Sequence, residues 1–450
     1  MINRKDRQII FFLSTALLLR TASGPTANIS YILIAFYALR GREQALQALF
    51  LSWLFSMLNG AFAPEASASA IGRYVLLITA SITIMSRRNS ALISKDDKSL
   101  IIFTLFFGIF IIFHSVLFSS IPDVSILKSI SWTVGMVTLI VGWASLNDYE
   151  RDRMSQQMFV GLALVMLLSL PLITLPSAYI GGVGFMGVLG HTQSFGITMA
   201  LLGTWVAVRS VVLPNPSWLL ISMNLICMVL IFMSGARTAA LALLIGVAAS
   251  MLLGSQLSKQ PGQYSFPGLR SRRVQLVILL MLIGIAVAWP RIVEQTNSFI
   301  AKGADSSNIG QAYQMSRGAL IDEMWVNIEN KPWQGVGFGI ATIPEMMEVI
   351  REPIFNLPTS AIVEKGVLPV AILEELGLVG FFYFVGWIFI ILKRCSRKSM
   401  SALAVFLVII LLNMGEAILF SSGGMGMLVM MLIAWAATGR SVKKSPPRLW

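Results

Sequence analysis

The chain has 450 residues, of which 56% are hydrophobic and 12% are charged, and its mean hydropathy is +0.77. Soluble globular proteins carry roughly 25% charged residues, so this composition excludes an ordinary soluble fold and indicates a membrane protein with several spans. The net charge of +13 would favour nucleic-acid binding in a soluble protein, but here the basic residues lie in short connections between apolar runs, so we expect no nucleic-acid partner.

Apolar runs long enough to cross a bilayer, which takes about 20 residues per helix, recur along the chain. They fall near residues 8–22, 28–40, 44–60, 71–86, 99–118, 126–145, 156–175, 193–211, 217–233, 237–254, 274–290, 370–392, 401–418 and 423–438. Backbone groups in lipid must hydrogen-bond internally, and the strict alternation of barrel strands is absent from these runs. The sequence therefore predicts an all-α polytopic membrane protein with about fourteen transmembrane helices.

The first apolar run follows a basic start, Arg4–Arg7, and ends at Arg20. This beginning resembles a signal peptide, but no clear cleavage site with small residues follows it. We therefore expect an uncleaved first span.

Basic residues are distributed unevenly over the connections between the runs. If the N-terminus lies in the cytoplasm and the spans alternate, most Lys and Arg residues fall on the inner side, as the positive-inside rule requires. This arrangement places both termini in the cytoplasm. It divides the chain into transmembrane helices over 1–290, a large outer loop over 291–369, and three further helices with a cytoplasmic tail over 370–450.

The outer loop has the composition of a folded segment rather than of a linker. It contains Trp325 and Trp333 together with several Pro and Gly residues, and apolar positions over 311–329 recur at helical spacing until Pro332 stops the pattern. Because long loops in compact proteins usually carry function, we expect a helix over 311–329 and a functional role for the loop.

Candidate functional residues appear first at the outer ends of predicted spans. His191 and Gln193 begin one span, and a polar helix cap explains the histidine equally well. Ser234 and Arg237 lie at a junction between two spans, where an arginine is either functional or a snorkelling side chain. His114, near the outer end of another span, is better explained by core packing.

The outer loop contributes a second group. Arg317 precedes Trp325 and the alternating glycines Gly335, Gly337 and Gly339. An isolated arginine is more simply a solvated surface residue. Alternating glycines allow a backbone to turn tightly or to approach a ligand closely, and these follow no predicted strand, which argues against a dinucleotide site.

Two arginines on one face of a membrane, Arg237 and Arg317, indicate an anionic ligand. Guanidinium groups bind phosphate oxygens in a bidentate manner and need no metal ion to do so. The outer connections contain no Asp-x-Asp pair, and Cys227 and Cys395 lie in an apolar run and a basic connection, where they neither pair nor form a metal motif. We expect a metal-free diphosphate site without a cofactor.

Charged residues also mark the end of the loop. Glu364 and Lys365 are followed by Glu374 and Glu375 at the outer start of the next span. Anchoring at the membrane interface explains the two later carboxylates. A buried carboxylate at this position would instead serve as a general base, because burial raises the pKa of a carboxyl group.

In this order, the motifs resemble the O-antigen ligase and polymerase superfamily of bacterial membrane glycosyltransferases, over roughly residues 185–440. The resemblance rests on a His-x-Gln-x-x-Gly run at 191–196, a Ser-x-x-Arg-Thr run at 234–238, Arg317 ahead of Trp325, Pro332 with Gly335, Gly337 and Gly339, and Leu373-x-Glu375-x-Gly377-x-x-Gly380.

The resemblance implies a fold similar to the family C glycosyltransferases, in the bacterial inner membrane. It implies a glycan donor on undecaprenyl diphosphate, a lipid or glycan acceptor, and a chain-length regulator as a candidate partner. Arg237 and Arg317 would hold the diphosphate and stabilise the leaving group, while the acceptor hydroxyl attacks the anomeric carbon directly. Further substrate contacts are expected from His191, Gln193, Ser234, Trp325, Gly335, Gly337, Gly339 and Glu375.

One departure bears on the assignment. Ligases of the superfamily commonly carry a His-Asn pair where this chain has Gly366 and Val367. Glu364 or Lys365 would then replace the acceptor-activating histidine, or the acceptor differs, so a polymerase is at least as good an interpretation as a ligase. A transporter of an anion or a lipid-linked saccharide and a non-catalytic scaffold are the alternatives, although transporters favour ionisable residues at mid-membrane.

Overall fold

The computed structural model describes residues 4–64, 66, 69–258, 264–280, 283, 318–352, 356–361, 363 and 365–439. Within these residues the chain is almost entirely helical, and its strands form two short antiparallel hairpins. The strands are β1 (Tyr179–Ile180), β2 (Gly184–Phe185), β3 (Val349–Arg351) and β4 (Pro358–Ala361). The all-helical membrane architecture predicted from the sequence is therefore confirmed in outline.

The helices before residue 260 follow one another with short connections. They are α1 (Arg4–Ala22), α2 (Gly24–Ala38), α3 (Arg42–Met57), α4 (Ser69–Ser86), α5 (Lys95–Phe118), α6 (Pro122–Ala144), α7 (Asp148–Ser169), α8 (Thr192–Val212), α9 (Trp218–Ser234) and α10 (Arg237–Leu257). Several begin at side-chain caps that the sequence encodes, such as Ser94 before α5 and Asn147 before α7.

The later described helices comprise one inside the loop 291–369 and three that follow it. They are α13 (Ala319–Asn330), α14 (Leu368–Lys398), α15 (Met400–Leu412) and α16 (Met425–Ala437). All residues of α16 are buried, because this helix lies among α3, α6, α14 and α15. The core of the described molecule is thus built around the last described helix.

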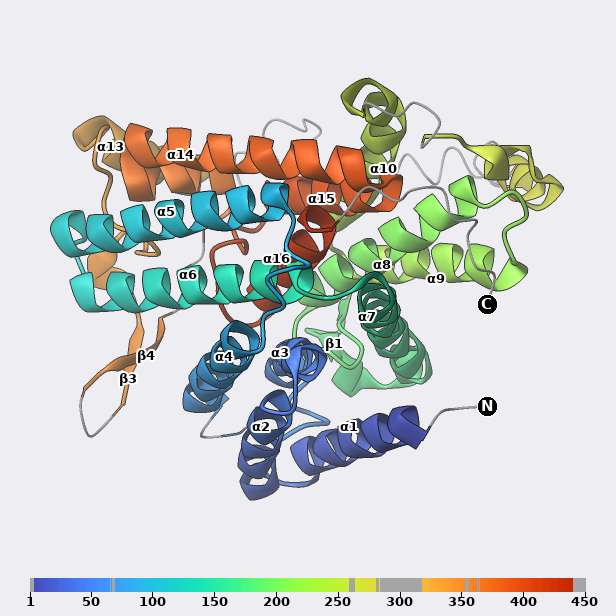
Figure 1. Ribbon diagram of the computed structural model, residues 1–450, viewed down its shortest axis with the longest axis horizontal. Helices are drawn as coiled ribbons and strands as arrows, with labels where there is room; N and C mark the ends of the chain where they lie inside the picture. Colours follow the sequence, from blue (N-terminus) through green and yellow to red (C-terminus); the bar gives the residue numbers. More distant parts are fainter. Residues whose placement is uncertain are drawn as a thin grey trace.

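Figure 1 shows α5, α6 and α14 side by side, with α13 and the β3–β4 hairpin at the end where α5 passes into α6. The N-terminal helices α1 to α4 gather on one side of this group. Trp132 on α6 and Trp387 on α14 are fully buried between these helices, and their rings meet edge to face. Such aromatic pairs add to the apolar area that they bury.

The described helices agree with the predicted spans in position. Seven of them, counting only the described residues, are long and apolar enough to cross a membrane, and four shorter apolar helices are also present. The predicted helix over 311–329 appears as α13 in its described part, and it ends beside Lys331, just before Pro332. The predicted span 274–290 lies largely outside the described residues, and those of its residues that are described are helical.

Connections between helices contact one another at one end of the described molecule. The backbone N–H of Ser120, between α5 and α6, donates to the carbonyl of Val336 in the outer loop at 3.1 Å. The N–H of Ala417, between α15 and α16, donates to the carbonyl of Lys365 at 3.0 Å. Connections assigned to the same face by charge therefore lie together, and this end carries the candidate site.

Candidate functional site

The outer loop is bound to α14 through an interruption of that helix. Gly377 has φ +63° and ψ −172°, outside the helical range, within the helix Leu368–Lys398. The freed carbonyls of Glu374 and Glu375 accept hydrogen bonds from the N–H groups of Val336 at 2.9 Å and Gly337 at 3.0 Å. The loop thus replaces hydrogen bonds that a continuous helix would make within itself.

Glycine is required on both sides of this contact. Gly335 has φ +66°, and a Cβ added there would lie 2.5 Å from the carbonyl oxygens of Glu374 and Glu375. A Cβ at Gly377 would collide with the carbonyl of Trp333. Side chains at these positions would combine an unfavourable left-handed conformation with a steric clash. At Gly335 the backbone therefore approaches the protein's own α14, and the predicted contact of the alternating glycines with a ligand stays a prediction.

His114 supports the same loop from α5. Its side chain is buried, and its Nε2 forms a hydrogen bond with the carbonyl oxygen of Gln334. The ring also packs against Phe110 and Phe118 of its own helix. His114 thus contacts the folded loop rather than an open site.

Three buried charged side chains, Lys365, Glu374 and Glu375, meet at the interrupted turn of α14. The Nζ of Lys365 is 2.7 Å from Oε2 of Glu374 and 3.1 Å from Oε1 of Glu375. The side chain of Asn327 on α13 donates to Oε1 of Glu374 at 2.7 Å, and the N–H of Gly339 donates to Oε2 of Glu375 at 2.7 Å. Each carboxylate therefore has an ion-pair partner and at least one hydrogen bond, as buried charges need.

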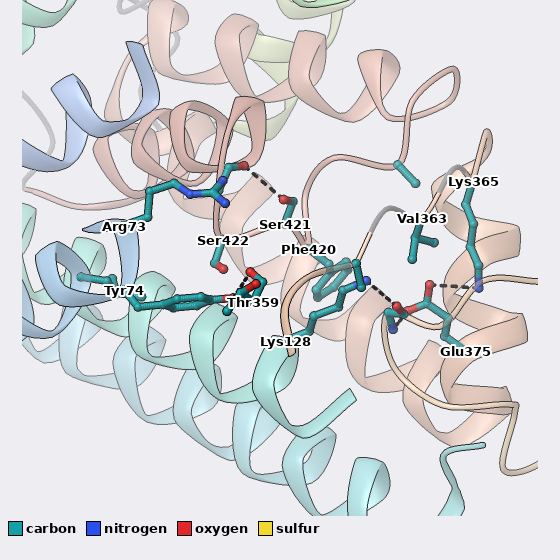
Figure 2. Close-up of a pocket in the computed structure, with 15 residues that line it drawn as sticks. Arg73, Tyr74, Lys128, Thr359, Val363, Lys365, Glu375, Phe420, Ser421 and Ser422 are labelled. Atoms are coloured by element: carbon teal, nitrogen blue, oxygen red, sulfur yellow. Dashed lines mark hydrogen bonds and ion pairs between the residues drawn. The ribbon is translucent and has the colours of Figure 1, made fainter. Parts of the chain in front are cut away.

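A cavity of about 350 Å³ opens beside this cluster. Figure 2 shows Arg73 and Tyr74 of α4 at one end of it and Lys365 and Glu375 at the other. The remaining walls come from α6, the outer loop with its β4 segment, and the connection between α15 and α16. These walls include Lys128, Gly339, Thr359, Ala361, Val363, Phe420, Ser421, Ser422 and Gly423.

The lining of the cavity has more cationic than anionic side chains. Lys128 donates from Nζ to the carbonyl of Gly339 at 2.7 Å, which occupies one of its three N–H donors. Glu375 is the carboxylate among the described lining residues, and it is already paired with Lys365. Arg73 is half-buried and has neither a carboxylate partner nor a hydrogen bond within the described part of the chain. The cavity is suited to an anionic ligand.

Residues 222–385 match the family model described as O-antigen ligase. This region is an O-antigen ligase domain. The match confirms the resemblance that the sequence motifs predict, and it includes the loop glycines together with Glu374 and Glu375. No curated protein matches the chain. The match supports a role in O-antigen assembly and a glycosyltransferase-like enzyme, and the described apolar helices support a membrane protein.

Two of the predicted motifs meet where α8 begins, α9 ends and α10 begins. Gly196 on α8 packs so closely against Ser234 and Ala236 that an added Cβ would lie 2.8 Å from the Ser234 Oγ. Ser234 is buried and accepts a hydrogen bond from the N–H of Ala236 at 3.3 Å. His191 is exposed and caps α8, accepting from the N–H of Gln193 at 3.2 Å. The cap interpretation accounts for the contact that the histidine makes.

Arg237 begins α10 and is half-buried. Its neighbour Thr238 lies against Gly415, in the same connection that hydrogen-bonds to Lys365 through Ala417. The ligase-domain motif therefore lies at the same end of the molecule as the cavity, although Arg237, His191, Gln193 and Ser234 are not among the residues that line it.

The predicted site residues of the outer loop do not all lie at the cavity. Trp325 is 49% exposed on α13, and Gly339 lines the cavity, whereas Gly335 and Gly337 contact α14 and the connection at Ser119. Arg317 and Glu364 lie outside the described residues. The structure brings Lys365, Gly339 and Glu375 together from the predicted set, and their roles with substrate stay predictions.

Sequence reasoning missed two cationic lining residues, Arg73 and Lys128. Both lie before residue 222, outside the region that matches the family. The signal was present, because each is a charged residue within a predicted span, and charged residues inside spans are functional candidates.

Proposed function

We propose that this protein transfers glycan from an undecaprenyl-diphosphate donor to a lipid-linked or sugar acceptor, at the outer face of the inner membrane. The observation that carries the proposal is a cation-rich cavity, built partly from the O-antigen ligase domain, at the end of the molecule assigned to the outer face by the charge distribution. Polymerase and ligase activities share this chemistry and differ in the acceptor.

The reaction is a direct displacement. The acceptor hydroxyl attacks the anomeric carbon, the bond from that carbon to the phosphate oxygen breaks, and the lipid diphosphate leaves with the bonding electrons. Arg237 and Arg317 hold the diphosphate and stabilise its growing negative charge. Because the hydroxyl replaces the leaving group on the opposite side, the anomeric configuration inverts.

The proton of the acceptor hydroxyl needs a base. Lys365 is a poor choice, because an ammonium group paired with two carboxylates has no lone pair to accept a proton. We assign it a positioning role toward Glu374 and Glu375. The proton acceptor is then Glu375, whose carboxylate lines the cavity, or Glu364 next to Lys365 in the chain.

The test of the diphosphate assignment uses Arg237→Ala and Arg317→Ala in a deletion strain, with Arg88→Ala as the matched control, since Arg88 is exposed beyond the other end of α4. Each site variant should abolish glycan assembly and cause lipid-linked donor to accumulate while membrane protein levels are maintained. Loss of long chains alone indicates a polymerase, and loss of attachment to a lipid core indicates a ligase.

Full assembly in both variants would overturn the diphosphate assignment. Uptake of a saccharide into vesicles without a new glycosidic bond would replace the proposal with the transporter alternative.

A second pair of variants assigns the base. Glu375→Gln and Glu364→Gln remove one carboxylate each while keeping side-chain size. The variant that removes the base should transfer glycan about 10²–10⁴-fold more slowly, which is the usual contribution of general base catalysis. Equal rates for both variants and the native protein would show that neither carboxylate accepts the proton.

A further inference from the structure

The cavity between α4, α6 and the connection before α16 has chemistry that the diphosphate assignment does not use. Arg73 contributes a guanidinium group without an ion pair among the described residues, and Lys128 retains N–H donors beyond its bond to Gly339. Lys365 adds a third cation that is already neutralised by Glu374 and Glu375. A half-buried cation without an ion pair beside a membrane protein's cavity is a candidate for binding an anionic ligand.

Hydroxyl groups line the space between the two cationic ends. Figure 2 shows Thr359 and Ser422 between Arg73 and Lys128. Tyr74 and Ser421 donate their hydroxyl hydrogens to the carbonyls of Thr359 and Gly423, at 3.5 and 3.1 Å, and both keep lone pairs that accept from a ligand. A wall of hydroxyls suits a polyol better than an acyl chain.

Phe420 adds an apolar surface to the same cavity. Its ring packs against the core through Trp132 and Phe338, so its position is fixed. Ligand sites commonly combine one apolar wall with a few placed polar groups. The hydroxylated edge of a sugar ring and its C–H face would meet the two kinds of wall respectively.

We propose that this cavity is a binding site for a short acidic saccharide, with the oxyanion of the sugar bound by Arg73 and its hydroxyls by the lining side chains. The oxyanion is a carboxylate or a phosphate, which share the bidentate geometry that arginine recognises. The volume of about 350 Å³ lies at the small end of ligand cavities, so a short saccharide fits and a long chain does not. The inference rests on the proposed glycan transfer for the class of ligand.

The experiment is a binding titration of the purified full-length protein in detergent by calorimetry. The probes are methyl glucuronide, glucose 6-phosphate, neutral methyl glucoside and inorganic phosphate. At least one acidic sugar should bind saturably, and at least tenfold more tightly than both methyl glucoside and inorganic phosphate. Preference for the glucuronide identifies a carboxylate ligand, and preference for the sugar phosphate identifies a phosphate ligand.

Substitutions of Arg73 test whether this residue binds the oxyanion of the sugar. Arg73→Gln should weaken the preferred probe about 10–100-fold, the effect expected when a hydrogen bond to a charged group is removed. Arg73→Lys keeps the positive charge but lacks the planar guanidinium group. Its affinity for the probe should lie between those of the native protein and Arg73→Gln. Arg88→Gln, the exposed control, should bind like the native protein, and size-exclusion profiles verify that each variant is folded.

Equal binding of neutral and acidic sugars, native binding by Arg73→Gln, binding of inorganic phosphate as tight as the sugar phosphate, or no saturable binding would each overturn the proposal. Failure here is distinguishable from failure of the proposed function. If Arg237→Ala blocks assembly while no acidic sugar binds, the site fails and the function stands. If acidic sugar binds through Arg73 while glycan assembly is normal in a deletion strain, the function fails instead.

Discussion

The charged residues at the two ends of the helices are arranged in different ways. At the end where α3, α5 and α7 begin, arginines are paired with carboxylates, as in Arg153 with Glu43 and Arg394 with Asp97. At the cavity, Arg73 has no such partner within the described residues. Paired charges hold helices together, whereas an unpaired cation beside a cavity is available to a ligand. This contrast, rather than the number of basic residues, separates structural charge from candidate function.

Lys365 combines features of both ends. It lines the cavity, yet it is bonded to two carboxylates and is only 4% exposed. Its position between the loop and α14 makes it the cation on which the shape of the cavity depends.

The largest effect is expected from Lys365→Met. Removing the ammonium group leaves Glu374 and Glu375 buried without their cation, and breaking a buried ion pair from one side costs about 3–5 kcal/mol. An unfolding titration of the solubilised protein should show this loss, while Lys331→Met at an exposed position should show almost none. A native-like transition for Lys365→Met would mean that the carboxylates are held by Asn327 and Gly339 alone.

The next effect is expected from Arg394→Gln at the other end of α14. Its side chain is 13% exposed, binds the nearly buried Asp97, and donates to the carbonyl of Ala437 at 2.6 Å. Losing hydrogen bonds from a charged donor should lower stability by about 2–3 kcal/mol. Lys393→Gln is the matched control, because Lys393 is exposed on the same turn. Equal unfolding midpoints for Arg394→Gln and Lys393→Gln would show that the paired arginine does not stabilise this end of the molecule.

The sequence predicts the helical spans well because each apolar run has to satisfy its own backbone in lipid. It also predicts the loop helix, since α13 combines helical spacing with a stop before Pro332. The alternating glycines were expected to turn tightly or to approach a ligand. At Gly335 the backbone approaches α14 instead, because a glycine permits close contact without specifying the partner.

The cavity itself could not be predicted from local pattern. Arg73, Lys128 and Glu375 are far apart in the chain and meet only when α4, α6 and α14 are packed together. The pairing of Lys365 with Glu374 likewise depends on packing, because it joins the end of the loop to the segment of α14 before the break at Gly377. A charge within a span marks a candidate, but its partners are set by tertiary structure.

A smaller effect is expected at the exposed pair between Arg351 of β3 and Asp123 of α6. The two groups lie 2.5 Å apart, but their side chains are 32% and 43% exposed. Exposed ion pairs contribute about 0–1 kcal/mol, and salt screens them. Asp123→Asn should therefore shift the unfolding midpoint slightly, and less at high salt. A salt-independent loss as large as that of Arg394→Gln would show that burial does not decide the strength of these pairs.

The smallest effect on stability is expected from Arg73→Gln, and it is the most informative. A residue that holds helices together costs stability when it is removed, as Arg394 should. Arg73 has no ion pair in the described structure, so its replacement should change the free energy of unfolding by no more than about 0.5 kcal/mol, as for substitutions away from structural contacts.

Unfolding titrations with and without an acidic sugar separate a structural role of Arg73 from a role in ligand binding. The native protein should be stabilised by the sugar, because a ligand that binds only the folded state shifts unfolding in proportion to its occupancy. Arg73→Gln should unfold like the native protein without the sugar and gain little from adding it. If Arg73→Gln instead lost as much stability as Arg394→Gln, Arg73 would belong with the structural charges.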